Sequence, residues 1–202
     1  MDAGTHRSPP RGTKGKSALR EVVETVVIAL LIALAIRHYV VEVFVVDGHS
    51  MEPTLRDGER LLVNKFIYRF HPPERGDIVV FRYPYGPGRR DFIKRVIAVA
   101  GDRIEARGDV VYVNGQPLDE PYLRFRHTGT FKARVVPPGT IWVMGDNRDN
   151  SEDSRAFGEI SLQYVKGKAF LRFWPLDRWD LLSGRVAAGP RATAPSTPMA
   201  GQ

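Results

Sequence analysis

Ser50 and Lys94 are two side chains that would make a nucleophile and its base if the fold brought them together. Ser50 lies within residues 45–55, and Lys94 lies within residues 91–99, a run dominated by apolar side chains. The two-residue period of a strand places Lys94 on an apolar face with Phe92. Burial on that face would favour the uncharged amine and can lower a lysine pKa by several units from about 10.4. An uncharged Lys94 could accept the proton of the Ser50 hydroxyl.

A third segment, residues 144–158, holds aspartate, asparagine and oppositely charged side chains in close succession. It is too polar to be core. Short Asp and Asn side chains bond their own backbone and let a long loop keep one shape. Asp153 and Arg155 could add a charge-assisted pair. Taken alone, this composition is that of a solvated surface loop.

Length and composition are those of one ordinary domain with appendages. The chain has 202 residues, of which 43% are hydrophobic, and it contains no cysteine, which excludes disulfides and a cysteine-ligated zinc site. The net charge of +7 is compatible with nucleic acid, anionic lipid or a solubility bias, and it does not choose among them. No glycine-rich phosphate loop, metal-ligand spacing or dinucleotide motif occurs, so we expect neither a metal nor a cofactor.

The N-terminal residues predict a membrane anchor. Residues 1–20 form a basic, disordered arm that cannot bury a core, and an uncharged stretch runs from Thr25 to Ile36. That stretch is short against the roughly 20 apolar residues that a bilayer crossing needs, but interfacial residues extend the predicted span to 21–41. The basic arm predicts a cytoplasmic N-terminus, which leaves the catalytic part, residues 42–182, on the outer face.

The sequence also raises the questions of whether the N-terminal segment is cleaved and whether the C-terminal segment is ordered. Ala33-Leu34-Ala35 has the small-x-small form of a cleavage site and would make the segment a secretory signal. We expect the segment to be kept, because no glycine or proline precedes these alanines to end the helix. After about Leu182 the chain turns to Ala, Gly, Pro, Ser and Thr, and residues 183–202 are predicted to be a disordered tail.

Short β-prone runs separated by turn residues fill the rest of the chain. Asn114-Gly115 is a strong hairpin signal, and Pro137-Pro138-Gly139 marks a second turn. This texture predicts a mainly β fold of folded-over antiparallel sheets or a partial barrel, with helix confined to the anchor and a turn near Pro53. The predicted strands cover residues 41–46, 60–63, 77–81, 92–99, 110–113, 133–136, 141–144 and 168–173.

Four segments in order resemble the sequence boxes of bacterial type I signal peptidases, the membrane-bound serine proteases that remove signal peptides from exported proteins. Residues 50–55, 76–81, 94–102 and 145–155 are similar to the family's nucleophile, structural-strand, lysine and last boxes. The resemblance implies a signal-peptidase-type β fold with one N-terminal transmembrane helix. It also implies a monomer in the bacterial plasma membrane that meets lipid and the signal peptides of exported preproteins.

The resemblance further implies a serine–lysine peptidase that cuts after small-x-small sequences. Ser50 would attack the scissile carbonyl, Lys94 would accept its proton and later give one to the leaving amine, and Ser151 would hydrogen-bond the lysine amine. The Ser50 N–H would be one oxyanion donor. Gly48 stands where one branch of the family has a serine donor, so the second donor stays open.

Supporting and pocket residues follow from the resemblance alone. Asp153 and Arg155 match family positions that support the loop carrying Ser151. Asp146 and Arg148 match positions with the same supporting role. Six apolar residues match two shallow pockets for small side chains, although each could equally belong to an ordinary β core: Phe44, Val46, Met51, Leu55, Phe92 and Ile93.

Other functions are less well supported. A histidine base is disfavoured, because His49 adjoins Ser50 on a strand and would point to the opposite face. Arginines alternate with aromatics from Phe66 to Arg95, as in a groove for single-stranded nucleic acid, but on a tethered domain they better suit a lipid surface. We therefore expect no nucleic-acid partner. The alternative function is a membrane-tethered β-barrel binding module without peptidase activity.

Overall fold

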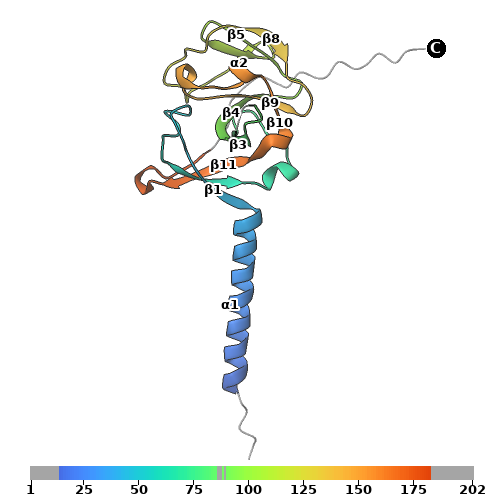
Figure 1. Cartoon of the computed structure of the whole chain (residues 1–202). Helices are drawn as coiled ribbons and strands as arrows, with labels where there is room; N and C mark the ends of the chain where they lie inside the picture. Colours follow the sequence, from blue (N-terminus) through green and yellow to red (C-terminus); the bar gives the residue numbers. More distant parts are fainter. Residues whose placement is uncertain (1–13, 86–87, 89, 183–202) are drawn as a thin grey trace, which may run out of the picture. The chain divides into compact units, whose positions relative to one another are not determined.

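The computed structural model describes residues 14–85, 88 and 90–182 (Figure 1). Most of the predicted arm and the predicted tail over 183–202 lie outside the described residues. The chain divides into two compact units, Met1–Tyr39 and Val40–Gln202. The described part of the first unit is helical, and every described strand belongs to the second.

The first unit contains the helix α1 (Lys14–Tyr39). It begins inside the arm that the sequence predicts to be disordered, because lysine, alanine, leucine and arginine between positions 14 and 20 all favour helix. Every residue from 18 to 34 is exposed. Among the described residues, none of the helices combines the length and apolarity needed to cross a bilayer. The predicted span over residues 21–41 is therefore not confirmed.

The second unit consists of two antiparallel sheets, which confirms the predicted mainly β fold. The larger sheet has the strand order β1-β2-β11-β3-β4-β9-β10, with β12 paired to β11. Its strands are β1 (Val41–Val45), β2 (Arg60–Asn64), β3 (Ile78–Arg82), β4 (Asp91–Val99), β9 (Thr140–Met144), β10 (Ile160–Ser161), β11 (Val165–Trp174) and β12 (Asp180–Leu181).

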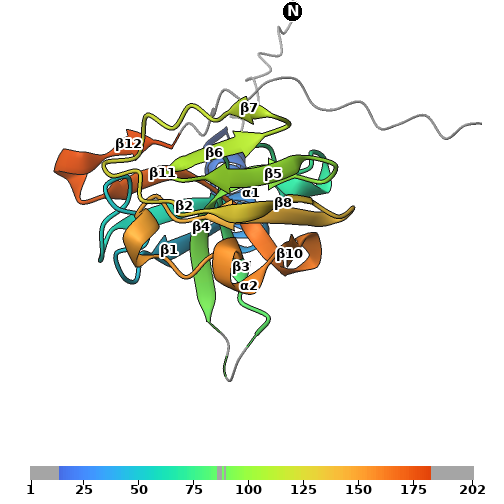
Figure 2. The ribbon, with the colours of Figure 1, turned by 90° about the horizontal axis from the view of Figure 1, so that it is seen from above.

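The smaller sheet has the order β7-β6-β5-β8, and Figure 2 shows β6, β5 and β8 running side by side across the unit. Its strands are β5 (Arg103–Arg107), β6 (Val110–Val113), β7 (Gln116–Pro117) and β8 (Phe131–Val135). Short helical turns complete the unit: η1 (Ile67–Arg69), η2 (Arg148–Asn150), α2 (Ser154–Phe157), η3 (Leu162–Tyr164) and η4 (Leu176–Arg178).

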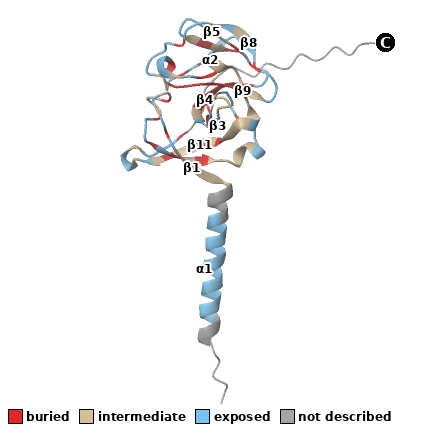
Figure 3. Cartoon of the chain, in the orientation of Figure 1, coloured by how far each residue is buried: buried red, intermediate tan, exposed pale blue. Residues whose placement is uncertain are grey.

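Strand β4 is apolar along most of its length because both of its faces are covered. Ile97 belongs to the core shared with the smaller sheet, which includes Ile104 and Trp142. Val96 and Val99 belong to a second core on the other side. Figure 3 shows buried residues along the strands of this unit. The lysine and arginine of β4 are thus carried into the interior by a strand that packing holds in place.

A third core holds the turn that follows β1. Met51 and Leu55 are fully buried in it together with Leu61 and Val63 of β2. The Leu55 N–H donates to the Met51 carbonyl oxygen at 2.9 Å, which closes a hydrogen-bonded turn and not a helix. The expectation that helix is confined to the anchor and this turn is wrong, because short helices form elsewhere in the unit, such as α2, which the Asp153 side chain caps by accepting from the Arg155 N–H. The apolar side chains of this turn point inward and fix the position of Ser50, the residue before Met51.

Candidate active site

Ser50 Oγ and Lys94 Nζ lie 2.7 Å apart, although 44 residues separate them in the chain. Ser50 is in the turn after β1, and Lys94 is inside β4. Lys94 Nζ also donates to the Ile93 carbonyl oxygen at 3.1 Å and lies 5.1 Å from the centre of the Phe92 ring. When the amine is uncharged, its lone pair can accept the Ser50 hydroxyl proton across the same contact.

Burial controls the protonation of Lys94, which is only 4% exposed. Loss of water has the largest effect and lowers its pKa from 10.5 to about 8, whereas the carboxylates of Asp153, Glu152 and Asp146 act in the opposite direction. At that pKa about one molecule in ten carries an uncharged Lys94 at pH 7. The site therefore holds a usable base near neutral pH.

The turn carrying Ser50 is tied to the polar loop that follows β9. The Asn147 N–H donates to the Ser50 carbonyl oxygen at 3.0 Å, and Asn147 Nδ2 donates to the His49 carbonyl oxygen at 3.1 Å. Thr54 Oγ1 donates to Asp146 Oδ2 at 2.6 Å. The polar loop is thus part of the site, and its composition alone would have placed it in solvent.

Buried ion pairs hold the polar loop in shape. Asp146 accepts two hydrogen bonds from Arg95 of β4, at 2.9 and 2.6 Å. The predicted pair between Asp153 and Arg155 is present, with Arg155 Nε 2.8 Å from Asp153 Oδ1, and Asp153 Oδ2 also accepts from the Gly145 N–H at 3.0 Å.

Arg148 extends this network. It is 3% exposed, pairs with Glu120 and donates to Thr128 Oγ1 at 2.8 Å. Burial acts to lower the pKa of Arg148, but the hydrogen bonds and negative charge of Glu120 oppose it, and the pKa ends above its usual value. Because each buried charge has a partner, the loop can remain charged in the interior.

Ser151 does not make the expected hydrogen bond to Lys94. Its Oγ is buried and has no hydrogen-bond partner among the described residues. The hydroxyl packs over Gly145, where an added Cβ would lie 2.2 Å from Ser151 Oγ and 2.4 Å from the Ser50 carbonyl oxygen. Glycine is required at position 145 because both segments approach its Cα closely.

A cleft of about 210 Å³ leads to Ser50 and Lys94. Most of its other lining residues are apolar, and we call it the apolar cleft, although Asp47, Asp91 and Glu152 also line it. Four of the six predicted pocket residues line it: Phe44, Val46, Phe92 and Ile93. The other two, Met51 and Leu55, are fully buried in the core beneath β2 instead. The inward-facing turn after Ser50 explains the difference, since its apolar side chains fill the interior.

Of the two backbone N–H groups considered as oxyanion donors, that of Gly48 is hydrogen-bonded to a described residue and that of Ser50 is not. The Gly48 N–H donates to Asp57 Oδ1 at 2.7 Å, so in this conformation it is not available as a second oxyanion donor. No described residue accepts a hydrogen bond from the Ser50 N–H. That N–H is thus free to stabilise a developing oxyanion.

The structure gives no support to a histidine base or to a nucleic-acid groove. His49 is exposed and contacts Glu52 (Nδ1 to Oε1, 3.1 Å) rather than Ser50. Two arginines of the supposed nucleic-acid groove are engaged in ion pairs, Arg75 with Asp102 and Arg95 with Asp146. No cluster of three or more potential metal ligands exists within the described part of the chain.

Sequence reasoning missed Asn147 and Glu120 as supports, because nothing in their local pattern shows which distant atoms they contact. Glu152 was missed as well. It lines the cleft, accepts a hydrogen bond from Tyr83 at 3.2 Å and acts on the pKa of Lys94. Its position between Ser151 and Asp153 in the polar segment was the available signal.

Comparison with known proteins places the chain in a family of peptidases. The family model described as signal peptidase, peptidase S26, matches residues 19–174, and the chain therefore belongs to this family. More particularly, it is 42% identical over 171 residues to a probable signal peptidase I-1 of Synechocystis sp., which covers 81% of this chain and 87% of the relative.

Further relatives carry similar names. Signal peptidase IB of Staphylococcus aureus (strain Mu50) is 39% identical over 182 residues, with 81% of this chain and 94% of the relative covered. A signal peptidase I from Enterococcus faecalis, known from a crystal structure, is 33% identical in sequence to this chain. The structural comparison gives a TM-score of 0.44 and covers 48% of this chain and 97% of that chain.

Proposed function

We propose that the chain is a serine endopeptidase that removes signal peptides from exported preproteins, with Ser50 as nucleophile and Lys94 as general base. The observation that carries the proposal is the 2.7 Å contact between Ser50 Oγ and a lysine amine that is 4% exposed. A nucleophile within hydrogen-bond distance of a base whose uncharged form is populated near neutral pH is the minimum apparatus for acyl transfer. Membership of the signal peptidase family supports the substrate class.

The edges of two strands support an extended substrate. Strand β1 pairs with β2 on one side and ends the order of the larger sheet. Residues 91–94 of β4 pair with β3, while the pairing of β4 with β9 begins only at Arg95. Both strands contribute residues to the cleft, so a peptide laid between them would meet free main-chain groups and bind as an added strand.

The size and apolarity of the cleft support the expected cleavage after small-x-small sequences. Alternate side chains of an extended peptide point to the same side. The first and third residues before the cut would therefore face the wall formed by Phe44, Val46 and Ile93, while the second would face outward. A cleft of about 210 Å³ accommodates short side chains at those two positions.

The reaction follows from the two reacting side chains. Ser50 Oγ attacks the scissile carbonyl carbon as its proton passes to Lys94 Nζ, and the Ser50 N–H donates to the oxyanion. The Lys94 ammonium then gives its proton to the leaving amine, and the C–N bond breaks to leave an ester on Ser50. Lys94, neutral again, removes a proton from water as the water oxygen attacks the ester carbon. Lys94 then gives that proton to Ser50 Oγ as the acyl–oxygen bond breaks, which restores the serine and releases the carboxyl product.

We further propose that α1 tethers the chain to the bacterial plasma membrane as a single-pass anchor with a cytoplasmic N-terminus. Apolar side chains on all sides of this helix are exposed, among them Val22, Ile28 and Leu31, and such a helix requires apolar surroundings. Extraction of membranes with alkaline carbonate tests the tether. Appearance of the protein in the soluble fraction would contradict it.

Cleavage of a preprotein by the full-length chain in detergent tests the peptidase. The product mass locates the cut, and Ser50→Ala should lower the rate about 10³-fold or more, because the nucleophile is lost. Ser161→Ala, at β10 and outside the cleft, is the matched control and should cleave like the wild type. Cleavage by Ser50→Ala at the control rate would refute the proposal.

A further inference from the structure

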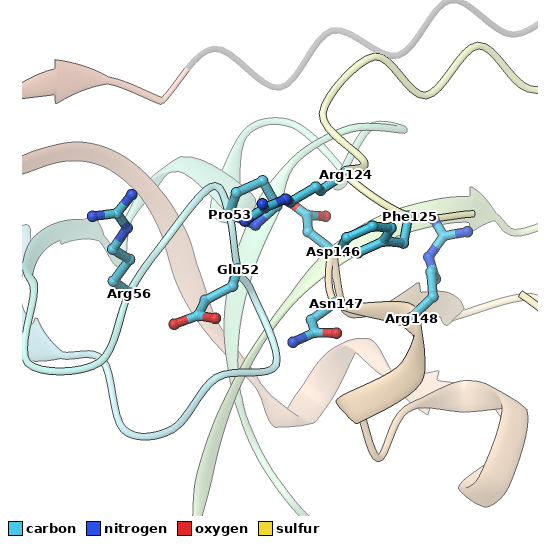
Figure 4. A pocket seen from close by; sticks show the side chains of 8 residues that line it. All are labelled: Glu52, Pro53, Arg56, Arg124, Phe125, Asp146, Asn147 and Arg148. Atoms are coloured by element: carbon cyan, nitrogen blue, oxygen red, sulfur yellow. The ribbon is translucent and has the colours of Figure 1, made fainter. Parts of the chain in front are cut away.

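A second cavity, of about 340 Å³, borders the turn that carries Ser50. Its walls come from three segments: Glu52 just after Ser50, Asn147 in the polar loop, and Arg124 with Phe125 in the loop between β7 and β8. Figure 4 shows these side chains around the opening. The cavity shares no lining residue with the apolar cleft.

The cavity begins next to the backbone of Ser50. Asn147, one of its lining residues, donates from its N–H to the Ser50 carbonyl oxygen at 3.0 Å. The turn after β1 lines both hollows, with Asp47 and Ser50 in the cleft and Glu52 in the cavity. A peptide whose residues before the cut fill the cleft continues past Ser50. At about 3.3–3.6 Å per extended residue, its second and third residues after the cut come within reach of the cavity.

The unneutralised charge on the cavity wall is mainly positive. Asp146 and Arg148 line the cavity, but each is neutralised by a buried partner, Arg95 and Glu120 respectively. Two further lining residues are exposed arginines, Arg56 and Arg124.

Neither of these two arginines forms an ion pair with a described residue, and Arg124 only lies over the Phe125 ring at 5.3 Å. The cavity wall also carries one further negative side chain, Glu52, which contacts His49. A carboxylate entering the cavity would therefore find two guanidinium groups able to bind it bidentately.

We propose that this cavity binds the second and third residues on the C-terminal side of the scissile bond and selects acidic side chains there. The inference rests on the proposed peptidase function and adds a second determinant to it: the apolar cleft selects small residues before the cut, and Arg56 and Arg124 select aspartate or glutamate after it. The preference is electrostatic, and it weakens as salt shortens the Debye length to about 3 Å at 1 M.

Peptide substrates that differ only at those two positions test the proposal. The full-length protein is given three peptides with one cleavage sequence, carrying Glu, Gln or Lys at the second and third positions after the cut. We expect kcat/KM for the Glu peptide to exceed that for the Lys peptide by about two- to fivefold for each arginine engaged at low salt. The Arg56→Gln/Arg124→Gln double variant should reduce the Glu-to-Lys ratio to one or below, because Glu52 remains on the wall.

Arg126→Gln is the matched control, because Arg126 is exposed in the same loop and does not line the cavity. It should keep the wild-type ratio. A wild-type ratio of one, a double variant that keeps the wild-type ratio, or an equal loss in Arg126→Gln would overturn the proposal; the last outcome would assign the preference to net charge.

A binding measurement separates this inference from the proposed function. The same three peptides, labelled with a fluorophore, are titrated into Ser50→Ala protein, which needs no catalysis. Tighter binding of the Glu peptide that is lost in the arginine double variant supports the cavity even if no peptide is cleaved, whereas equal affinities would exclude it. Absence of cleavage by the wild type would count against the peptidase alone.

Discussion

Lys94→Met should stabilise the protein at neutral pH while it removes the proposed base. Lys94 is 4% exposed, and burial lowers its pKa from 10.5 to about 8. One pKa unit corresponds to about 1.4 kcal/mol, so the charged lysine costs the folded protein about 3 kcal/mol relative to the unfolded chain. Methionine has a similar length and no charge, and therefore removes this cost while it keeps most of the packing.

The sign of the pH dependence follows from the direction of the shift. The pKa of Lys94 is lower in the folded protein, so between about pH 8 and pH 10.5 the unfolded chain binds more protons and wild-type stability rises with pH. Below about pH 8 the cost is complete, and above about pH 10.5 it is gone. The stability difference between Lys94→Met and wild type should thus change by about 3 kcal/mol across this interval. Loss of the hydrogen bonds to Ser50 and Ile93 offsets about 1 kcal/mol each at every pH.

Urea unfolding followed by tryptophan fluorescence measures this difference at about pH 6, 8 and 10.5. Lys132→Met, at an exposed position of β8, is the control and should show no comparable pH dependence. A difference between Lys94→Met and wild type that stays constant with pH would refute the argument that burial lowers the lysine pKa. Peptidase activity in the methionine variant would refute the role of Lys94 as base.

Two further predictions concern the same site. For the wild type, kcat/KM should rise with pH along one ionisation with its midpoint near pH 8, where Lys94 loses its proton. Glu152→Gln removes a carboxylate that raises the pKa of Lys94, so it should move this midpoint to lower pH. A kcat/KM that does not change with pH over this range would contradict both expectations. Gly145→Ala should lower kcat/KM about hundredfold, while circular dichroism shows that the fold is retained. The new Cβ would lie 2.4 Å from the Ser50 carbonyl oxygen, and displacement of reacting groups by about 1 Å can lower the rate by that factor. Wild-type kinetics in this variant would show that the Ser50 turn is more tolerant than its packing suggests.

The strand carrying Lys94 was predictable, and the turns around it were not. An apolar run with a period of two indicates β4 and its buried lysine without any tertiary information. By contrast, β5 (Arg103–Arg107) was missed, because charged residues at 103, 105 and 107 leave only Ile104 and Ala106 to face the core. Such a short alternation is a weak signal until a partner sheet covers it.

Some contacts of the candidate site were predicted from the sequence, such as those of Ser50 with Lys94 and of Asp153 with Arg155, and others were not. Ser50 and Lys94 meet as the motifs suggested, whereas Ser151 Oγ lies against Gly145 and makes no hydrogen bond to the lysine. Met51 turns into the core rather than toward the cleft. Rotamers and turn directions depend on neighbours that are distant in sequence, and no local pattern records them. The supporting role of Asn147 is hidden for the same reason.

The turn that carries Ser50 is held by residues synthesised much later. Asn147 bonds the carbonyl of His49 across 98 positions, and Asp146 accepts from Thr54 across 92. A nascent chain that has emerged only through β8 therefore has its serine but lacks the clamp that aims it. The clamp can form only after translation has passed Asn147. Before that point, Ser50 sits in a turn that lacks its two hydrogen bonds to the polar loop.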